Sequence, residues 1–318
     1  MTEENYDLYE LTRGHQTKYT DEIEKYDINK QISTLFLKED NHTITVSHRR
    51  FTINMENYVN EKGLLYKNLR INVNPSLIKY ISIEISGCRI DSLYYDIYEV
   101  LMNYFGVQNI PNSGYFYIPS SIIQSGFPVL RWHGIKLIIE FKEQEVPETL
   151  KLKFDLYKIN GFVDGIDFDE IYGKEEGYTK DCKPIQFICK QLQYCGREEC
   201  PDEDEYEEYE KSLSIHKYRL NYNHVSELII VEYADKNASI NEVQINHKIS
   251  NNGKVYETKE KLYCKIGNFC VYKFKTFINF SRTDYSIILS PKCIKNIYMI
   301  NHNIVQMLGG MAGLHFSK

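Results

Sequence analysis

A regular alternation of apolar and polar side chains is the feature that most constrains how this sequence can fold. It is clearest in the segments 77–85, 135–141, 150–156 and 270–278, where apolar residues recur at every second position over most of the length. Successive side chains of a β-strand point to opposite faces, so this pattern predicts half-buried strands. The chain also contains 27 Tyr and 15 Phe but only three alanines, which disfavours helix. We therefore predict an all-β fold.

One segment departs from the alternation. Residues 91–105 place Leu93, Ile97, Val100, Leu101 and Tyr104 at helical intervals, and Asp91 or Ser92 is available as an N-terminal cap. We predict a short helix inserted between strands.

The length of 318 residues favours two domains, each large enough to bury its own core. The charged segment around Pro147 separates two strand-rich halves and is the best boundary, because alternation stops at Phe141 and resumes at Leu152. The predicted organisation is an N-terminal arm at 1–40, a first domain at 41–146 and a second domain at 147–318.

The net charge of -6 argues against nucleic-acid binding, which usually needs a basic face. No apolar segment follows Met1, and no apolar run reaches the ~20 residues that a membrane helix needs, so we expect the chain to fold in the cytosol. Seven carboxylates lie in the run 202–210, for which we predict a solvated loop; the alternative is a site for a cation or a basic partner.

The eight cysteines are expected to be reduced thiols. Four of them, Cys182, Cys189, Cys195 and Cys200, would be the ligands of an alternative zinc site, but their spacing lacks the usual C-x2-C pair. The histidines are scattered singly. No Gly-rich phosphate loop or nucleophile elbow is present. We predict no catalytic residue, no cofactor and no bound metal.

The last residues of the sequence are unusually apolar and glycine-rich for a terminus, which predicts a buried C-terminal strand followed by a docked tail. The stretch "IYMINHNIVQMLGGMAGLHFSK" resembles the C-terminal strand and tail of the major capsid proteins of nucleocytoplasmic large DNA viruses. The matching residues there are Asn301, Asn303, Gly310, Met311, Gly313 and Leu314.

Further matches to this family follow in the family's order along residues 45–318. "SHRRFTINMENY" matches at Arg49, Arg50 and Thr52, and "ISIEISGCRIDSLYYD" at Gly87, Ile90 and Asp91. "YIPSSIIQSGFPVLRWHGIKLIIEF" matches at Pro119, Pro128 and His133, and "LNYNHVSELIIV" at Asn221, Asn223 and His224. "INFSRTDYSIIL" matches at Asn279, Phe280, Ser281, Arg282 and Asp284.

The resemblance implies two consecutive eight-stranded jelly rolls, a non-enzymatic capsid subunit that forms homotrimers, and pseudo-hexagonal capsomers tiling an icosahedral shell. It implies as partners the chain itself, neighbouring capsomers, minor capsid proteins and an internal viral membrane, with no direct nucleic-acid contact. The expected location is the virion, assembled in the cytoplasm of the infected cell. The matched polar residues are expected to be satisfied corner and interface groups.

The sequence is shorter than is usual in this family, and a long loop expected before "INFSR" is missing. A minor capsid paralogue or a transient assembly scaffold of the same fold therefore stays open as an alternative. In a different functional class, a jelly-roll protein that binds carbohydrate or metal is the competing hypothesis.

Overall fold

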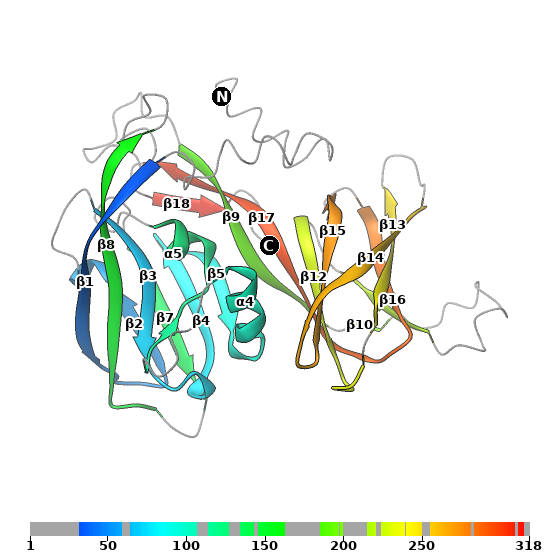
Figure 1. Cartoon of the computed structure of the whole chain (residues 1–318), viewed down its shortest axis with the longest axis horizontal. Coiled ribbons are helices and arrows are strands. Elements are labelled where there is room, and N and C mark those ends of the chain that lie inside the picture. Colours follow the sequence, from blue (N-terminus) through cyan, green and yellow to red (C-terminus); the bar gives the residue numbers. More distant parts are fainter. Residues whose placement is uncertain are drawn as a thin grey trace. The chain divides into compact units, whose positions relative to one another are not determined.

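The computed structural model consists mainly of β-strands joined by short helices and turns (Figure 1). It describes residues 32–58, 64–106, 114–126, 134–142, 146–162, 185–196, 198–199, 215–220, 224–238, 240–249, 255–280, 283–308 and 311–314. All four alternating segments form strands, and their apolar sets are buried; Ile81, Ile83 and Ile85, for example, are 3%, 4% and 1% exposed. The all-β prediction is confirmed.

The first eight strands form two four-stranded antiparallel sheets. They are β1 (Ile32–Thr45), β2 (Arg50–Asn54), β3 (Leu64–Asn72), β4 (Ile78–Ile85), β5 (Cys88–Tyr94), β6 (Phe116–Tyr117), β7 (Lys136–Phe141) and β8 (Thr149–Phe162). One sheet has the order β1-β8-β3-β6 and the other β2-β7-β4-β5. Strands distant in sequence are thus neighbours in each sheet, as two Greek keys require, and we call this set the first jelly roll.

The remaining strands repeat this order. They are β9 (Ile185–Gly196), β10 (Glu198–Glu199), β11 (His216–Arg219), β12 (Val225–Tyr233), β13 (Glu242–Ile249), β14 (Val255–Ile266), β15 (Phe269–Asn279), β16 (Thr283–Ser290), β17 (Ile294–Leu308) and β18 (Met311–Leu314). The neighbours β9-β17-β12-β15 correspond to β1-β8-β3-β6, and β11-β16-β13-β14 correspond to β2-β7-β4-β5. We call β9–β17 the second jelly roll.

Strand β14 joins the two sheets of the second jelly roll into one continuous ten-stranded sheet. Its first part, Val255–Lys261, pairs with β13, and its last part, Leu262–Ile266, pairs with β15. The strand therefore crosses from one sheet to the other at a corner of the sandwich. A two-residue turn beginning with Gly267, at φ +60°, then leads into β15.

Short helices interrupt the first jelly roll. They are η2 (Met55–Tyr58), η3 (Pro75–Leu77), η4 (Tyr95–Ile97), α4 (Tyr98–Tyr104) and α5 (Ser121–Ser125). The inserted helix is present, but its predicted start at residue 91 is wrong because Asp91–Tyr94 pair with β4 as the end of β5. Among the described residues, no helix has the length and hydropathy needed to cross a membrane.

The predicted domain borders need correction at both ends of the first jelly roll. Strand β1 begins at Ile32, inside the range 1–40 predicted as an arm, and β8 ends at Phe162, beyond the predicted border at 146. Both shifts have one cause: β8 is the partner of β1 along its whole length, and a jelly roll closes only when its first and last strands pair.

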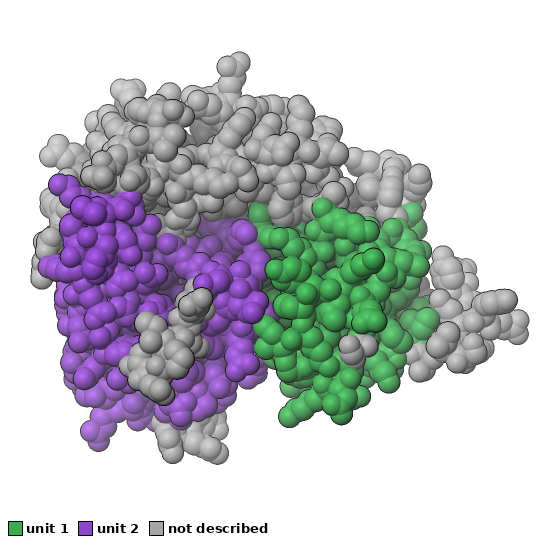
Figure 2. Space-filling model, in the orientation of Figure 1, with its two compact units in different colours: residues 1–22, 192–302 green, residues 23–191, 303–318 purple. Residues whose placement is uncertain are grey.

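The chain divides into two compact units, shown in different colours in Figure 2. The described residues of one unit lie within Leu192–His302. Those of the other run up to Gln191 and resume at Asn303. Strands β9 and β17 therefore contribute residues to both units, and the division does not coincide with a loop.

The C-terminal strand is interior to the second jelly roll, as predicted. Residues 294–302 of β17 lie between β12 and β9, and Ile297, Met299 and Ile300 are fully buried. The tail also docks: β18 pairs with the end of β17 and lies against β5. The docking partner is thus a strand of the first jelly roll. Residues 315–318 lie outside the described part of the chain.

Candidate functional site: buried polar clusters

The structure places only some of the residues singled out by the sequence. Pro128, His133, Asn221, Asn223, Ser281, Arg282 and Gly310 lie outside the described residues. Asn279, Asp284 and Met311 are on strands β15, β16 and β18, and only their backbone positions are described. The others fall into two buried clusters, two backbone corners and a remaining group with no shared environment.

The first cluster lies on β12 and β17 of the second jelly roll and consists of Ser226, Glu227, Asn301 and His302. The Nε2 atom of His302 is 3.0 Å from the Oε2 atom of Glu227, and these residues are 2% and 6% exposed. The Nζ atom of Lys273 lies 3.5 Å from the Oε1 atom of Glu227. A buried carboxylate is tolerated only with such partners, so this pair fixes the register of β17 against β12.

Two residues that the sequence pointed to lie on β12 and β17 or next to them: Asn301, in this cluster, and His224, immediately before β12. The Ser226 hydroxyl donates to the Oδ1 atom of Asn301 at 3.0 Å, and Asn301 is fully buried. His224 is 1% exposed, and its Nε2 atom lies 3.5 Å from the amide nitrogen of Gln193. Both predicted residues are therefore buried among polar neighbours and have no access to a substrate.

The second cluster consists of Asp91, Ser120, Gln191 and Asn303. The carboxylate of Asp91 accepts from the Ser120 hydroxyl at 2.8 Å and from the Ser92 N–H at 2.9 Å. Asn303 donates to the Gln191 side chain at 2.8 Å, and Gln191 donates in turn to the carbonyl of Ile90. These bonds tie β5, β9 and β17 together through side chains.

Two of the predicted residues hold backbone corners. The Nε–H of Arg49 donates to the carbonyl of Phe141 at 2.9 Å, which closes the start of β2 on the end of β7. Gly87, at φ +80°, follows Ser86, at φ +53°, in the two-residue turn between β4 and β5. Two successive positive φ values define a type I′ hairpin, for which glycine is favoured.

The last group shows no shared environment. Arg50 and Thr52 are exposed on β2, Pro119 and Phe280 are buried, and Gly313 and Leu314 are half-buried on β18. The structure does not bring them together.

The sequence interpretation did not select His302, Gln191 or Gln193. A signal for His302 was present, because "NHN" interrupts a strand that is otherwise apolar, and a polar run inside a buried strand must find partners. No such signal exists for Gln191, since its partners Ile90 and Asn303 lie on distant strands.

Ionisable groups form two further clusters, one in each jelly roll. In the first, Arg70 pairs with Asp155 at 2.9 Å and with Glu39, and the hydrogen bond from Lys153 at 2.7 Å lowers the pKa of Glu39. Arg70 itself is 7% exposed. The network lies on β1, β3 and β8 and holds these strands together.

In the second jelly roll, Glu232 accepts from Lys295 at 2.8 Å, from Asn268 at 2.9 Å and from Asn296 at 2.5 Å. Burial alone would raise the pKa of this carboxyl, but the three hydrogen bonds outweigh burial, and the pKa lies below its ordinary value. Glu232 is therefore ionised at neutral pH and anchors the ends of β12, β15 and β17.

The described cysteines do not form a metal site. Cys189 and Cys195 are six positions apart on β9, about 20 Å of strand, so they cannot bind one ion. Burial raises the pKa of the Cys189 thiol well above its ordinary value, which disfavours the thiolate. Cys182 and Cys200 lie outside the described residues, and the described part of the chain contains no group of His, Cys, Asp and Glu that could hold a metal.

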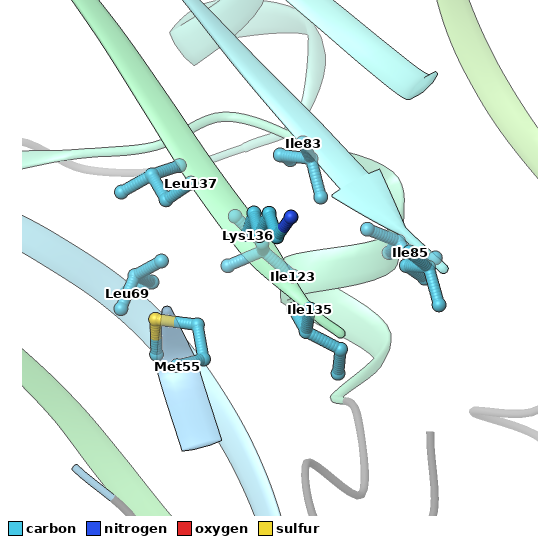
Figure 3. A pocket seen from close by; sticks show the side chains of 9 residues that line it. Met55, Leu69, Ile83, Ile85, Ile123, Ile135, Lys136 and Leu137 are labelled. Carbon is cyan, nitrogen blue, oxygen red and sulfur yellow. The ribbon is translucent and has the colours of Figure 1, made fainter. Parts of the chain in front are cut away.

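A small apolar gap opens between the sheets of the first jelly roll (Figure 3). Its empty space is about 300 Å³, counted with the solvent at its mouth, and aliphatic side chains such as Ile83, Ile123, Ile135 and Leu137 line it. Lys136 is the one lining residue that carries a charge. A ligand pocket needs several convergent polar groups, so we interpret this gap as imperfect core packing.

Two successive jelly rolls with the same strand order define the double jelly-roll fold. No protein-family model matches the sequence, and no curated protein sequence matches it. Solved structures do match. The capsid of the virus PBCV-1, a quasi-atomic model, is similar with a TM-score of 0.56 and 13% identity over 90% of this chain and 97% of that chain.

A second similar structure is the crystal structure of PBCV-1 VP54 fitted into a reconstruction of the virophage Sputnik. Its TM-score is 0.54, its identity 14%, and the match covers 90% of this chain and 97% of that one. At this identity the likeness shows the fold alone. The chain has the double jelly-roll fold of these capsid structures across nearly its whole length.

Proposed function

We propose that this chain is a structural subunit of a viral capsid. The observation that carries the proposal is the repeated strand order of the two jelly rolls, together with the structural similarity to the PBCV-1 capsid over 90% of this chain. The polar clusters support it, because each polar side chain is buried among side chains of neighbouring strands. They stabilise the strand arrangement, and we assign no catalytic activity to them.

The finer part of the proposal rests on the family resemblance. The chain forms homotrimers, the trimers are pseudo-hexagonal capsomers, and the capsomers tile an icosahedral shell in virions assembled in the cytoplasm. Neighbouring capsomers, minor capsid proteins and an internal viral membrane are the proposed partners. The matched residues act in this proposal as structural groups that hold strands and corners in place.

Light scattering on the purified chain tests this proposal. The expected particle has three times the chain mass of 37.6 kDa, and electron microscopy should show a pseudo-hexagonal outline. A chain that stays monomeric at every concentration, or that forms only two-fold assemblies, contradicts the proposal. A chain that folds correctly but does not self-associate cannot act as the subunit of a capsid shell.

One observation supports a second candidate, in which the chain takes a minor capsid position or acts as a transient scaffold. The β14–β15 connection is a two-residue turn, so the protein has no long outer loop at this corner. Quantitative mass spectrometry of purified particles separates the two roles. A major subunit dominates the particle protein, a minor subunit is present at a few per cent, and a scaffold is nearly absent.

A further inference from the structure

The first strand of the first jelly roll has a free edge with exposed apolar side chains. Strand β1 is the end strand of the sheet β1-β8-β3-β6, and no described strand is hydrogen-bonded to its outer edge (Figure 1). On this strand Leu35, Phe36 and Leu37 are 54%, 52% and 42% exposed. We call these three residues the apolar edge. Because they are consecutive, they form one continuous patch, unlike singly exposed apolar residues, which are normal on a protein surface.

The pairing of β1 with β8 explains why all three side chains reach solvent. Phe36 pairs with Tyr157 and Lys38 pairs with Leu156, so Leu37 is the extra residue of a β-bulge. The two residues before the bulge are successive and therefore point to opposite faces of the strand. Both are more than half exposed, so neither face of β1 is covered at this point.

Beside the apolar edge the sheet narrows to two strands. Pairing of β3 with β8 begins where Leu64 lies opposite Lys158, and Leu35 of β1 lies opposite the same lysine on the other side. From there to its end, β8 has β1 as its only strand neighbour in the described part of the chain. The exposure of the apolar edge thus follows from the strand order, and the described strands of this sheet do not cover it.

The apolar edge also lacks the features that usually protect a free strand edge. Natural edge strands carry charges or proline, which prevent them from associating with another chain. Residues 32–37 contain neither, whereas Lys38, Glu39 and Asp40 follow directly. The bulge interrupts regular backbone pairing at Leu37, so the contact that this edge favours is packing of side chains.

A second copy of the same segment is a suitable partner, because the segment is complementary to itself. In an antiparallel arrangement about a two-fold axis at Phe36, Leu35 of one copy faces Leu37 of the other. Lys38 and Glu39 then face uncharged residues of the other copy, so no like charges meet. Apolar side chains cover one another in this arrangement without repulsion between the flanking charges.

Symmetry and area indicate where such a contact belongs. A surface that binds itself joins copies two by two, so it cannot be satisfied among the three chains of one trimer. About half of each large side chain is exposed, which offers on the order of 300 Å² per copy against the ~800 Å² per partner of a stable complex. The contact is therefore too small to hold two free chains together, and it suits trimers that meet in a larger assembly.

We propose that the apolar edge of one trimer packs against the apolar edge of a neighbouring trimer across a two-fold axis. The inference rests on the proposed capsid function and names one surface through which trimers join. The contact is apolar, so raising the salt concentration should not dissociate it.

A charge-exchange experiment tests the proposal. In F36K two lysines meet across the axis, and in F36E two carboxylates meet, so each variant should form trimers whose association is weakened about tenfold in sedimentation velocity. A mixture of F36K and F36E trimers should associate to within about threefold of the wild type, because opposite charges then meet. This recovery is expected only if the segment binds itself. A mixture that associates no better than either variant alone contradicts the proposal.

The variant L35S/F36S/L37S removes the apolar edge without adding charge. It should leave the trimers intact and weaken their association at least as much as the charged variants do. The control V255S/Y263S removes apolar side chains that are 50% and 65% exposed on β14, and it should leave association unchanged. If the serine variant of the apolar edge associates like the wild type, the proposal is wrong.

Vesicle flotation tests a lipid surface as the other occupant of an exposed apolar segment. Vesicles of phosphatidylcholine, with and without phosphatidylserine, should bind the wild type and L35S/F36S/L37S equally. If the wild type floats with the vesicles, the serine variant does not, and mixing F36K with F36E restores nothing, the partner is a membrane and the proposal is wrong.

The outcomes separate this inference from the proposed function. If trimers form and associate independently of the apolar edge, the inference fails and the capsid proposal stands. If the wild type stays monomeric at all concentrations, the capsid proposal fails, and the mixture of F36K and F36E then decides alone. A mixture that dimerises where neither variant does supports the edge contact, and a mixture that stays monomeric overturns it.

Discussion

The two jelly rolls have the same strand order but place their middle strand in different surroundings. In the first, β3 carries Arg70, whose ion pairs reach the partly exposed Glu39. In the second, every residue of β12 is buried, including Ser226, Glu227 and Glu232. The comparison shows that a shared strand order does not determine which polar and charged side chains a strand can accommodate. A strand buried on both faces must pair each of its polar groups within the protein.

The jelly rolls also differ in how their sheets are closed. The sheets of the first are separate, whereas β14 makes those of the second continuous. Among the described residues, β5 and β6 end the two sheets of the first roll without a further hydrogen-bonded strand, while the equivalent strands of the second, β14 and β15, pair with each other. We expect the second roll to depend more strongly on each central strand.

The largest effect should come from removing the central strand of the second jelly roll. Deletion of residues 297–318 removes most of β17 and exposes both β12 and β9, so we expect insoluble or partly unfolded protein. Limited proteolysis should still yield a stable fragment that ends after β8, because all strands of the first roll remain.

Deletion of residues 309–318 is the matched control for this experiment. It removes β18 but leaves β17 in place, so the protein should stay folded; a loss of trimers in light scattering is expected only if the tail also reaches a neighbouring subunit. Soluble trimers that melt cooperatively after the longer deletion would show that β17 is peripheral and would remove the basis of the comparison.

A smaller effect should separate the buried pair of the second roll from the network of the first. His302→Leu removes the histidine partner of the buried Glu227 carboxylate and should lower the unfolding free energy by about 3–5 kcal/mol. Arg70→Met leaves carboxylates that water can reach and should cost about 1–3 kcal/mol. Urea denaturation measures both. The comparison is broken if the Arg70 variant is the less stable of the two.

The pH dependence sharpens the same contrast. The pKa of Glu232 is lowered from 4.5, so the folded protein binds this proton more weakly than the unfolded chain does. Its contribution is therefore present above about pH 4.5 and is lost as the pH falls through the folded pKa. The unfolding free energy of the wild type falls between pH 7 and pH 3, and Glu232→Gln should make this fall smaller by about 1–3 kcal/mol.

Glu39→Gln provides the counterpart in the first jelly roll. The pKa of Glu39 is also lowered, so the sign is the same, but its side chain is 41% exposed and solvent screens its partners. The change in the profile should be smaller than for Glu232. If the two substitutions changed the pH dependence of the unfolding free energy equally, burial of β12 would have no electrostatic consequence.

The smallest effects concern the two tight turns. Ser86 adopts φ +53° in the β4–β5 turn, so Ser86→Gly should relieve backbone strain and raise stability by up to about 1 kcal/mol. Gly267→Ala in the β14–β15 turn should lower it by about 1 kcal/mol or more. Thermal unfolding measures both. If Gly267→Ala raised the melting temperature, the β14–β15 turn would not require a glycine at this position.

Sequence alternation was sufficient to predict the strands but not their partners. The pattern in "KLKFDLY" identified β8 as a strand, yet the same pattern suits either jelly roll, and its pairing with β1 decides membership. Residues 91–94 satisfied both a strand and a helix pattern. The hydrogen bonds to β4 settled the choice, and no local rule contains them.

The polar clusters show the same limit. The turn at Gly87 could be predicted because its reason is local, a backbone conformation that glycine adopts readily. The pairing of Glu227 with His302 could not, because these residues are 75 positions apart: the run "NHN" indicates that His302 needs a partner, but nothing near it in sequence says which residue that partner is. Long-range pairing, which defines the site, is the information that a single sequence lacks.

The closure of each jelly roll has a kinetic consequence. Contacts that join β8 to β1 link residues as distant as Lys153 and Glu39, 114 positions apart, and those that join β17 to β9 link Asn303 to Gln191, 112 positions apart. Such non-local contacts give a high contact order, for which refolding takes milliseconds to seconds or longer. Unpaired strand edges stay open during that time, so dilution and low temperature during refolding should decide how much protein escapes aggregation.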